Sequence, residues 1–155
     1  MFQSFLEQRR ISRGGESKQR EVWRLVQRHC GERILIFTAD NAAAYALGRK
    51  FCWPVLTHRT RPAERKEFLD RFRDGTYRVL VTSKVLNEGV DVPAVGVGII
   101  LSGSGSVREH VQRLGRLLRP APGKERAVLY ELVSAGTGEE NVSARRREHR
   151  AYLHH

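Results

Sequence analysis

The chain has 155 residues, 40% of them hydrophobic, and a formal net charge of +11. That length and apolar content suit one domain with a buried core. Only five of the 28 Lys and Arg residues are Lys, so 23 are Arg; this balance favours phosphate-bearing partners, although GC-rich codon usage also raises the Arg content. No stretch approaches the roughly 18 consecutive apolar residues of a membrane span. Residues 1–10 lack the apolar run of a signal peptide, so we expect a cytoplasmic protein.

The start of the chain, residues 1–15, is polar and irregular, and we interpret it as a linker or a helix end. A helix is expected next, with Ser17 as its N-cap and Cys30 near its end. Apolar residues recur in it at helical spacing and would face the core: Val22, Leu25 and Val26, with Trp23 as a further candidate.

A short and continuously apolar run at 34–38 predicts a central parallel strand that is buried on both faces. Asp40 follows in the position of an N-cap, before an Ala-rich helix that extends to about residue 51. Residues 54–57 form the next expected strand. Pro62 suits the first turn of a further helix, which ends at Gly75 and buries Phe68, Leu69 and Phe72.

Three more strands are expected at 78–82, 96–101 and 127–133, with an Arg-rich helix at about 106–119 between the last two. Strands that alternate with helices of about ten or more residues predict a single α/β domain with a mostly parallel, doubly wound sheet flanked by helices. We place this domain at residues 16–140. Residues 141–155 are basic and form a C-terminal tail or helix, either solvated or in contact with DNA or a partner protein.

The two cysteines, Cys30 and Cys52, lie within apolar-periodic stretches and have neither a CxxC spacing nor nearby His ligands. This is not the pattern of a zinc site, so we expect two buried thiols and no metal site.

Segment 112–119 reads Gln-Arg-Leu-Gly-Arg-Leu-Leu-Arg. At about 100° per residue, Gln112, Arg116 and Arg119 fall on one stripe of a helix, opposite an apolar face. Two guanidiniums held side by side favour an anion as their partner, and the Arg fork suits phosphate oxygens. The alternative is the solvated basic face of an ordinary amphipathic helix.

A second group of polar residues follows the apolar run at 79–81. Thr82 and Ser83 come directly after it, and Gly89 and Asp91 follow in the expected loop. These residues bring hydroxyls, backbone N–H groups and a carboxylate to the carboxyl end of a strand, where open α/β sheets bind ligands.

Together these two segments resemble motifs V and VI of the superfamily-2 helicases, which lie in the second of two RecA-like lobes. Residues 33–38 look like the motif IV strand, and residues 61–73 are similar to the helix with a Glu-Arg pair and a Phe-Arg ending. Three further stretches, 57–60, 102–106 and 129–139, resemble the archaeal and bacterial XPB-type DNA repair helicases. The resemblance covers nearly the whole chain. It implies a RecA-like domain that serves as the C-terminal motor lobe of an ATP-dependent DNA helicase or translocase.

The resemblance also implies roles for single residues. Arg116 and Arg119 would reach the γ-phosphate of ATP as arginine fingers, and Gln112 would hydrogen-bond in the same network. Gly89 and Asp91 would face the nucleotide sugar or couple that site to the DNA strand.

The nucleic-acid contacts implied by the resemblance come from Thr38, Thr82 and Ser83, whose hydroxyls would donate to DNA backbone phosphates. Such contacts carry no sequence information, which suits a motor that moves along any sequence.

Two parts of an ATPase are absent from the sequence, the Walker A pattern and an acidic Mg²⁺-binding motif after a strand. ATP with Mg²⁺ would therefore be bound mainly by an N-terminal lobe of the same parent protein, and we expect this lobe alone to be inactive. Other implied partners are DNA and, as in prokaryotic members of the branch, a nuclease. The alternative function is a stand-alone RecA-like module that binds DNA or protein without catalysis. A basic nuclease is disfavoured, because no carboxylate cluster is present to bind metal.

Overall fold

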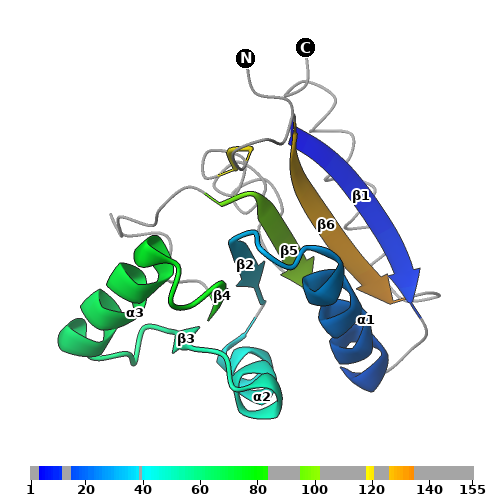
Figure 1. Ribbon diagram of the computed structural model, residues 1–155. Coiled ribbons are helices and arrows are strands. Elements are labelled where there is room, and N and C mark those ends of the chain that lie inside the picture. The colour runs from blue at the N-terminus through cyan, green and yellow to red at the C-terminus, as the bar shows by residue number, and fades with distance from the viewer. Residues whose placement is uncertain are drawn as a thin grey trace.

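The computed structural model describes residues 4–11, 15–38, 40–83, 95–101, 118–120 and 126–134. In this part of the chain, six strands form one entirely parallel sheet (Figure 1). The strands are β1 (Ser4–Ile11), β2 (Ile34–Phe37), β3 (Val55–Leu56), β4 (Val79–Thr82), β5 (Val97–Leu101) and β6 (Ala127–Ser134), in the spatial order β1-β6-β5-β2-β4-β3. Helices α1 (Gly15–Arg28), α2 (Asn41–Phe51) and α3 (Pro62–Asp74) connect the strands in chain order.

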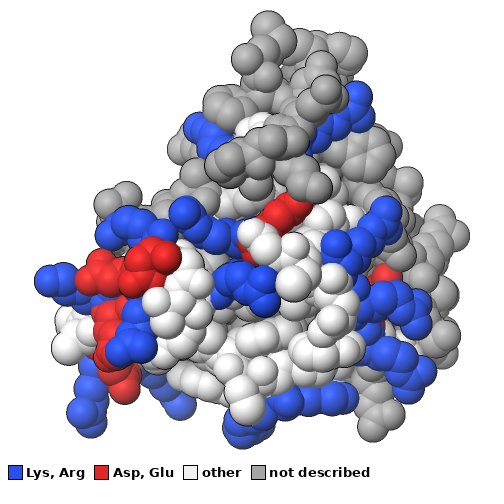
Figure 2. All heavy atoms as spheres, in the orientation of Figure 1, with Lys and Arg blue, Asp and Glu red and all other residues white. Residues whose placement is uncertain are grey.

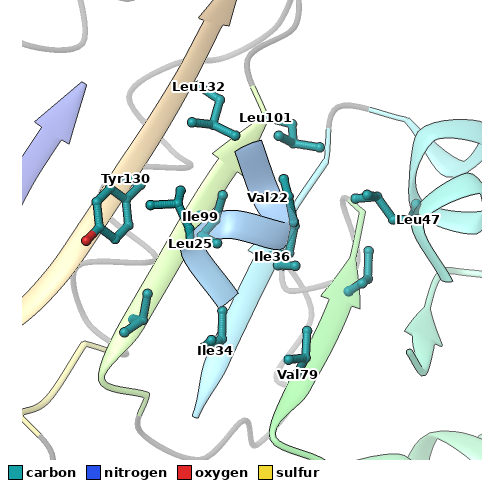
Figure 3. Packing of buried hydrophobic residues seen from close by; sticks show 13 residues of the cluster. Val22, Leu25, Ile34, Ile36, Leu47, Val79, Ile99, Leu101, Tyr130 and Leu132 are labelled. Carbon is teal, nitrogen blue, oxygen red and sulfur yellow. The ribbon is translucent and has the colours of Figure 1, made fainter. Parts of the chain in front are cut away.

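Helices cover both faces of this sheet, because each central strand is apolar on both sides. On one face, Val22 and Leu25 of α1 lie over Ile36 and Ile99 of the strands beneath, and Leu47 of α2 joins the same cluster (Figure 3). On the other face, α3 buries Leu69 and Phe72 in the cluster that includes Leu35, Phe37 and Leu80. The prediction of a doubly wound parallel α/β sheet, with the run at 34–38 as a strand buried on both faces, is confirmed.

The start of the chain differs from the prediction. The segment interpreted as a linker or a helix end contains β1, which pairs in parallel with β6 from Ser4 opposite Ala127 to Ile11 opposite Ser134. β1 lies at the edge of the sheet and hydrogen-bonds through backbone groups to one neighbour. Such a strand tolerates charged residues and needs no long apolar run, so the hydropathy pattern gave no signal.

The boundaries of α2 and α3 follow the local signals in the sequence, whereas α1 begins at Gly15, so Ser17 lies inside the helix and the prediction of Ser17 as its N-cap is wrong. The carboxylate of Asp40 accepts a hydrogen bond from the backbone N–H of Ala43 at 2.7 Å and caps α2. Pro62 occupies the first turn of α3, and Gly75 ends it with a φ of +91°. L-residues avoid this left-handed conformation, which explains the glycine.

Three details of the predicted helices are wrong. Trp23 is 43% exposed, whereas the neighbouring Val22 is fully buried. Both cysteines are exposed, since Cys30 and Cys52 lie just beyond the ends of α1 and α2. The Arg-rich helix does not reach residue 119, because Leu118 forms a parallel β-bridge with Val95 and the Arg119 N–H donates to the Val95 carbonyl at 2.8 Å.

Gly48 is the position in α2 where a side chain has no space. A Cβ there would overlap Cγ2 of Val55 and lie 3.1 Å from the Trp53 carbonyl oxygen. We expect Gly48→Ala to lower the free energy of unfolding by about 1–3 kcal/mol, because overlap in a packed region outweighs the gain of about 0.5–1 kcal/mol in helix propensity. Urea unfolding followed by circular dichroism measures the change. The double variant Gly48→Ala/Val55→Ala should be less destabilised than the sum of the single changes, and a Gly48→Ala variant more stable than the parent would contradict the packing argument.

Candidate functional site

The carboxyl ends of three neighbouring strands carry buried hydroxyl groups. Because β2, β4 and β3 are parallel, Thr38, Thr82 and Thr57 lie at the same edge of the sheet, and each is completely buried, as is Ser83 to within 1%. Burying a hydroxyl without a partner costs free energy, so each of these groups needs an internal acceptor or donor. This carboxyl edge is where a parallel α/β sheet binds ligands.

Thr38 and Thr82 hold the ends of their strands together. The Thr38 N–H donates to the Thr82 carbonyl at 2.9 Å, which extends the pairing of β2 with β4 by one residue. The Thr38 hydroxyl donates to the Asp40 carbonyl at 2.9 Å, and the Thr82 hydroxyl donates to the Ser83 carbonyl at 2.9 Å. The sequence-predicted residues are therefore brought together, and their hydroxyl protons already have internal acceptors.

Ser83 begins a chain of hydrogen bonds that leads to the surface. Its hydroxyl donates to the Asn41 side-chain oxygen, and the Asn41 amide lies 3.1 Å from Nδ1 of His58. Asn41 is the first residue of α2, and His58 is exposed. When the Asn41 amide donates to Nδ1, a neutral His58 ring carries its proton on Nε2, so a hydrogen-bond donor faces away from the chain of bonds.

Thr57 is the centre of a second set of hydrogen bonds beside the first. Its hydroxyl lies 2.7 Å from the Tyr45 hydroxyl and accepts from the Arg59 N–H at 3.1 Å. Its carbonyl accepts from Arg65 Nη2 at 3.5 Å, and its own N–H donates to the Thr60 hydroxyl at 2.9 Å. Arg65 Nε is buried without a hydrogen-bond partner among the described residues.

The loop that Thr57 holds presents cations outward. Arg59 and Arg61 are exposed, and neither takes part in an ion pair within the part of the chain that the structure describes. An exposed guanidinium on a hydrogen-bonded loop is a ready partner for phosphate oxygens. The carboxyl edge therefore combines buried, hydrogen-bonded hydroxyl groups with exposed cations on the loop that follows β3.

Arg119 does not lie at the carboxyl edge of the sheet. It is half-buried, follows the bridge to Val95 at the amino-terminal side of β5, and donates from Nη1 to the Leu118 carbonyl at 2.8 Å. Its backbone therefore lies at the end of the sheet opposite to Thr38 and Thr82. The other sequence-predicted residues, Gln112, Arg116, Gly89 and Asp91, lie outside the described residues.

Sequence reasoning missed Asn41, Tyr45 and Thr57 as members of the site. The signal for Thr57 was present, since a Thr follows an apolar strand here as at Thr38 and Thr82. Asn41 and Tyr45 gave no such signal, because their roles arise only when α2 packs beside β3 and β4. Within the described residues, no three His, Cys, Asp or Glu side chains gather as a metal site requires, and no helix is long and apolar enough to cross a membrane.

The hydrogen bond between Ser83 and Asn41 has a measurable energetic consequence. Asn41→Ala leaves the buried Ser83 hydroxyl without its acceptor, so we expect the free energy of unfolding to fall by about 1–3 kcal/mol. In Asn41→Ala/Ser83→Ala both partners are removed, and the double variant should lose less than the sum of the two single changes. Chemical denaturation of the four proteins gives the coupling energy, and additive losses would contradict the bond.

Solved structures share this fold. The C-terminal domain of the DEAD-box protein Dbp5 superposes with a TM-score of 0.76 at 21% identity, over 96% of this chain and 84% of that one. The E. coli DEAD-box protein SrmB gives a TM-score of 0.77 at 19% identity, over 96% of this chain and 85% of the other. At these identities the likeness establishes the RecA-like fold.

Comparison with curated sequences identifies relatives that are more similar to this chain than the solved structures are. The DNA 3'-5' translocase XPB2 of Sulfurisphaera tokodaii is 42% identical over 138 residues, which are 89% of this chain and 31% of that protein. The DNA 3'-5' helicase XPB of Kineococcus radiotolerans is 39% identical over 84% of this chain and 24% of its own length. The chain thus spans less than a third of these relatives.

Residues 17–121 match the family described as the helicase conserved C-terminal domain. With more than half of the chain matched, a RecA-like fold and XPB helicases among its relatives, the chain belongs to the helicase conserved C-terminal domain family, as a RecA-like lobe similar to that of the XPB proteins.

Proposed function

We propose that this chain is the C-terminal motor lobe of an ATP-dependent DNA helicase or translocase that acts in DNA repair. Membership of the helicase C-terminal family supports the motor role. The observation that carries the proposal is the carboxyl edge of the sheet, where Thr38, Thr82 and Ser83 meet beneath outward-facing arginines. The relatives from Sulfurisphaera tokodaii and Kineococcus radiotolerans are named for 3'-5' movement, and we propose the same polarity here.

The ATPase half of the proposal requires a second lobe. Phosphoryl transfer from ATP needs a phosphate cradle, Mg²⁺ and positive charge on the transition state. ATP with Mg²⁺ would sit mainly on the N-terminal lobe of the same parent protein, and Arg116 and Arg119 would supply the charge, with Gln112 in the same network. Gly89 and Asp91 would face the nucleotide sugar or couple that site to the DNA strand. The guanidinium of Arg119 is permanently charged and planar, which suits it to phosphate oxygens.

The DNA half of the proposal separates two kinds of residue. The hydroxyls of Thr38, Thr82 and Ser83 donate internally, so each must exchange an acceptor before it donates to a phosphate. We propose that they hold the carboxyl ends of β2 and β4 in place, and that they reach DNA only when these internal hydrogen bonds open. Arg59 and Arg61 need no such exchange, and we propose that they make the first backbone contacts.

A conformational cycle connects the two halves. ATP between the lobes would favour a closed state, and its hydrolysis would release the arginines and let the lobes step along one strand. A ligand shifts the equilibrium between open and closed lobes only if it binds one state more tightly than the other. Two arginines that contact the γ-phosphate only in the closed state would supply this difference in affinity. A nuclease partner remains a prediction of the family resemblance.

The shared active site predicts that neither lobe is sufficient. We expect the 155-residue chain alone to hydrolyse ATP at the background rate, and fusion to an N-terminal helicase lobe with a Walker A lysine to restore DNA-stimulated turnover. In that fusion, Arg119→Ala should lower kcat by about 10³-fold or more, as for arginine fingers in GTPases, and leave DNA affinity largely unchanged. Thermal unfolding of the variant controls for lost stability. Sustained turnover by the isolated chain would overturn the shared-site proposal.

The DNA contacts predict a change in salt dependence. In the two-lobe fusion, Arg59→Gln and Arg61→Gln should each weaken binding to single-stranded DNA and reduce the slope of log K against log salt by about 0.7 per lost phosphate contact. Loss of affinity should be similar for mixed-sequence and dT oligonucleotides, measured by fluorescence anisotropy. Arg73→Gln is the matched control, because Arg73 is an equally exposed cation on the last turn of α3. Unchanged slopes in both variants would remove these arginines from the interface.

A further inference from the structure

The amino-terminal edge of the sheet, opposite to the candidate site, contains a pocket of about 340 Å³. Residues before β3 and β4 line it together with the ends of α1 and α2, among them Trp23, Cys30, Cys52, Trp53, Tyr77 and Arg78. A strand of four residues such as β4 spans about 13 Å, so this pocket and the carboxyl edge are separate surfaces. A volume of this size accommodates a bulky side chain or a small ligand.

One wall of the pocket is aromatic and rigid. The ring of Trp23 stacks on Phe51 at a centroid distance of 5.1 Å with an interplanar angle of 7°, and Phe51 lies 4.6 Å from Trp53. Trp23 nevertheless remains 43% exposed. A large apolar surface that is held in place yet left in water is the kind of surface that binding partners use as an anchor.

Arg78 gives the pocket its charge. Among the described residues that line the pocket, it is the only one with a formal charge, and it is exposed. Its Nη1 donates to the Cys30 sulfur at 3.3 Å, a weak acceptor, and no ion pair among the described residues involves it. A guanidinium with only a thiol as its partner favours a carboxylate or phosphate from outside.

The described residues near the pocket lining add charges of both signs. The ammonium group of Lys50 lies 5.7 Å from the centre of the Phe51 ring, on the rim of the aromatic wall. Two nearby carboxylates have partners within the chain, since Glu32 lies 3.4 Å from the ring of His29, and Asp74 accepts from both the N–H and the hydroxyl of Thr76. These bonds from Thr76 lower the pKa of the Asp74 carboxyl. Figure 2 shows one face of the molecule, on which Lys and Arg side chains lie around a largely uncharged central area and Asp and Glu side chains also reach its border.

We propose that this pocket binds an acidic peptide segment of a partner protein. A bulky apolar side chain of the peptide would enter the pocket against Trp23 and Trp53, and a neighbouring Asp or Glu would pair with Arg78. We favour a peptide over a nucleic acid, because aliphatic groups of Val26, Pro54 and Val79 suit an apolar side chain, and because the described lining holds one cation where a nucleic-acid backbone is bound by several. Binding at this edge leaves the carboxyl edge with Thr38, Thr82 and Ser83 uncovered.

The composition of the chain makes the test specific. Trp23 and Trp53 are its only tryptophans, and Cys30 and Cys52 its only cysteines, and all four line the pocket. Intrinsic tryptophan fluorescence and thiol alkylation by N-ethylmaleimide, followed by intact mass, therefore report on this surface alone.

In the experiment, peptides that bind the chain are selected from a library of random 12-residue sequences. We expect enriched peptides that combine Asp or Glu with a large apolar residue, that change the tryptophan emission and that slow alkylation of both thiols. Arg78→Glu should weaken their binding by about tenfold or more, and replacing the apolar residue of the peptide with Ala should have a similar effect. Arg73→Gln, an exposed cation outside the pocket, is the control and should bind as the parent does.

Three outcomes would overturn the proposal: selection that yields no binder, enriched peptides without acidic residues, or peptides that bind Arg78→Glu as well as the parent. A dT12 oligonucleotide is tested in parallel. If it alone protects the two thiols and the peptides do not, the pocket is a nucleic-acid contact and the peptide proposal is wrong.

Discussion

The parallel pairing of β2 with β4 on one side and β5 on the other determines where everything else in the chain lies. Ile34 is opposite both Val79 and Val97, and this register continues to the ends of the strands. In a parallel sheet all carboxyl ends point one way, so a single register places Thr38 beside Thr82 and, at the other edge, aligns the residues that precede β3 and β4. The candidate motor site and the aromatic pocket are thus two consequences of one set of backbone hydrogen bonds.

Buried hydroxyl groups hold the carboxyl ends of these parallel strands in place through internal hydrogen bonds. Thr38, Thr57 and Thr82 could not be replaced by aliphatic residues without loss of hydrogen bonds at the ends of these strands, since each is fully buried and each is hydrogen-bonded within the chain. A hydrogen bond of this kind contributes about 1 kcal/mol, but leaving its partner unsatisfied costs more. Within the described residues, the carboxyl ends of β2, β3 and β4 are therefore held in place before any ligand arrives, which reduces the entropy that a ligand must offset.

Sequence predicted the parts of the fold that depend on local chemistry. Apolar runs predicted β2, β4, β5 and β6, and the caps at Asp40 and Gly75 placed the ends of two helices, because capping and left-handed φ values are properties of single residues. The sequence did not predict the features that depend on tertiary contacts. β1 pairs at an edge and needs no apolar run, Trp23 packs on aromatic residues of another helix rather than in the core, and Leu118 leaves the helical pattern because Val95 offers it a bridge. In the candidate site, Thr38, Thr82 and Ser83 were found from their place after strands. The contribution of Asn41 required knowledge of how α2 packs.

The Arg content illustrates why charge alone does not identify a site. Arg71 pairs with Glu67 at 3.1 Å and Arg73 with Asp70 at 3.2 Å along α3, where both partners are about half exposed. Exposed pairs of this kind contribute little to stability, so they explain neither the abundance of Arg nor its function. Arg59, Arg61 and Arg78 differ, because among the described residues each lacks an ion-pair partner and each sits on a backbone held by other contacts. A guanidinium in that position needs little reordering to meet an anion, and for this reason we propose Arg59, Arg61 and Arg78, rather than Arg71 and Arg73, as binding residues.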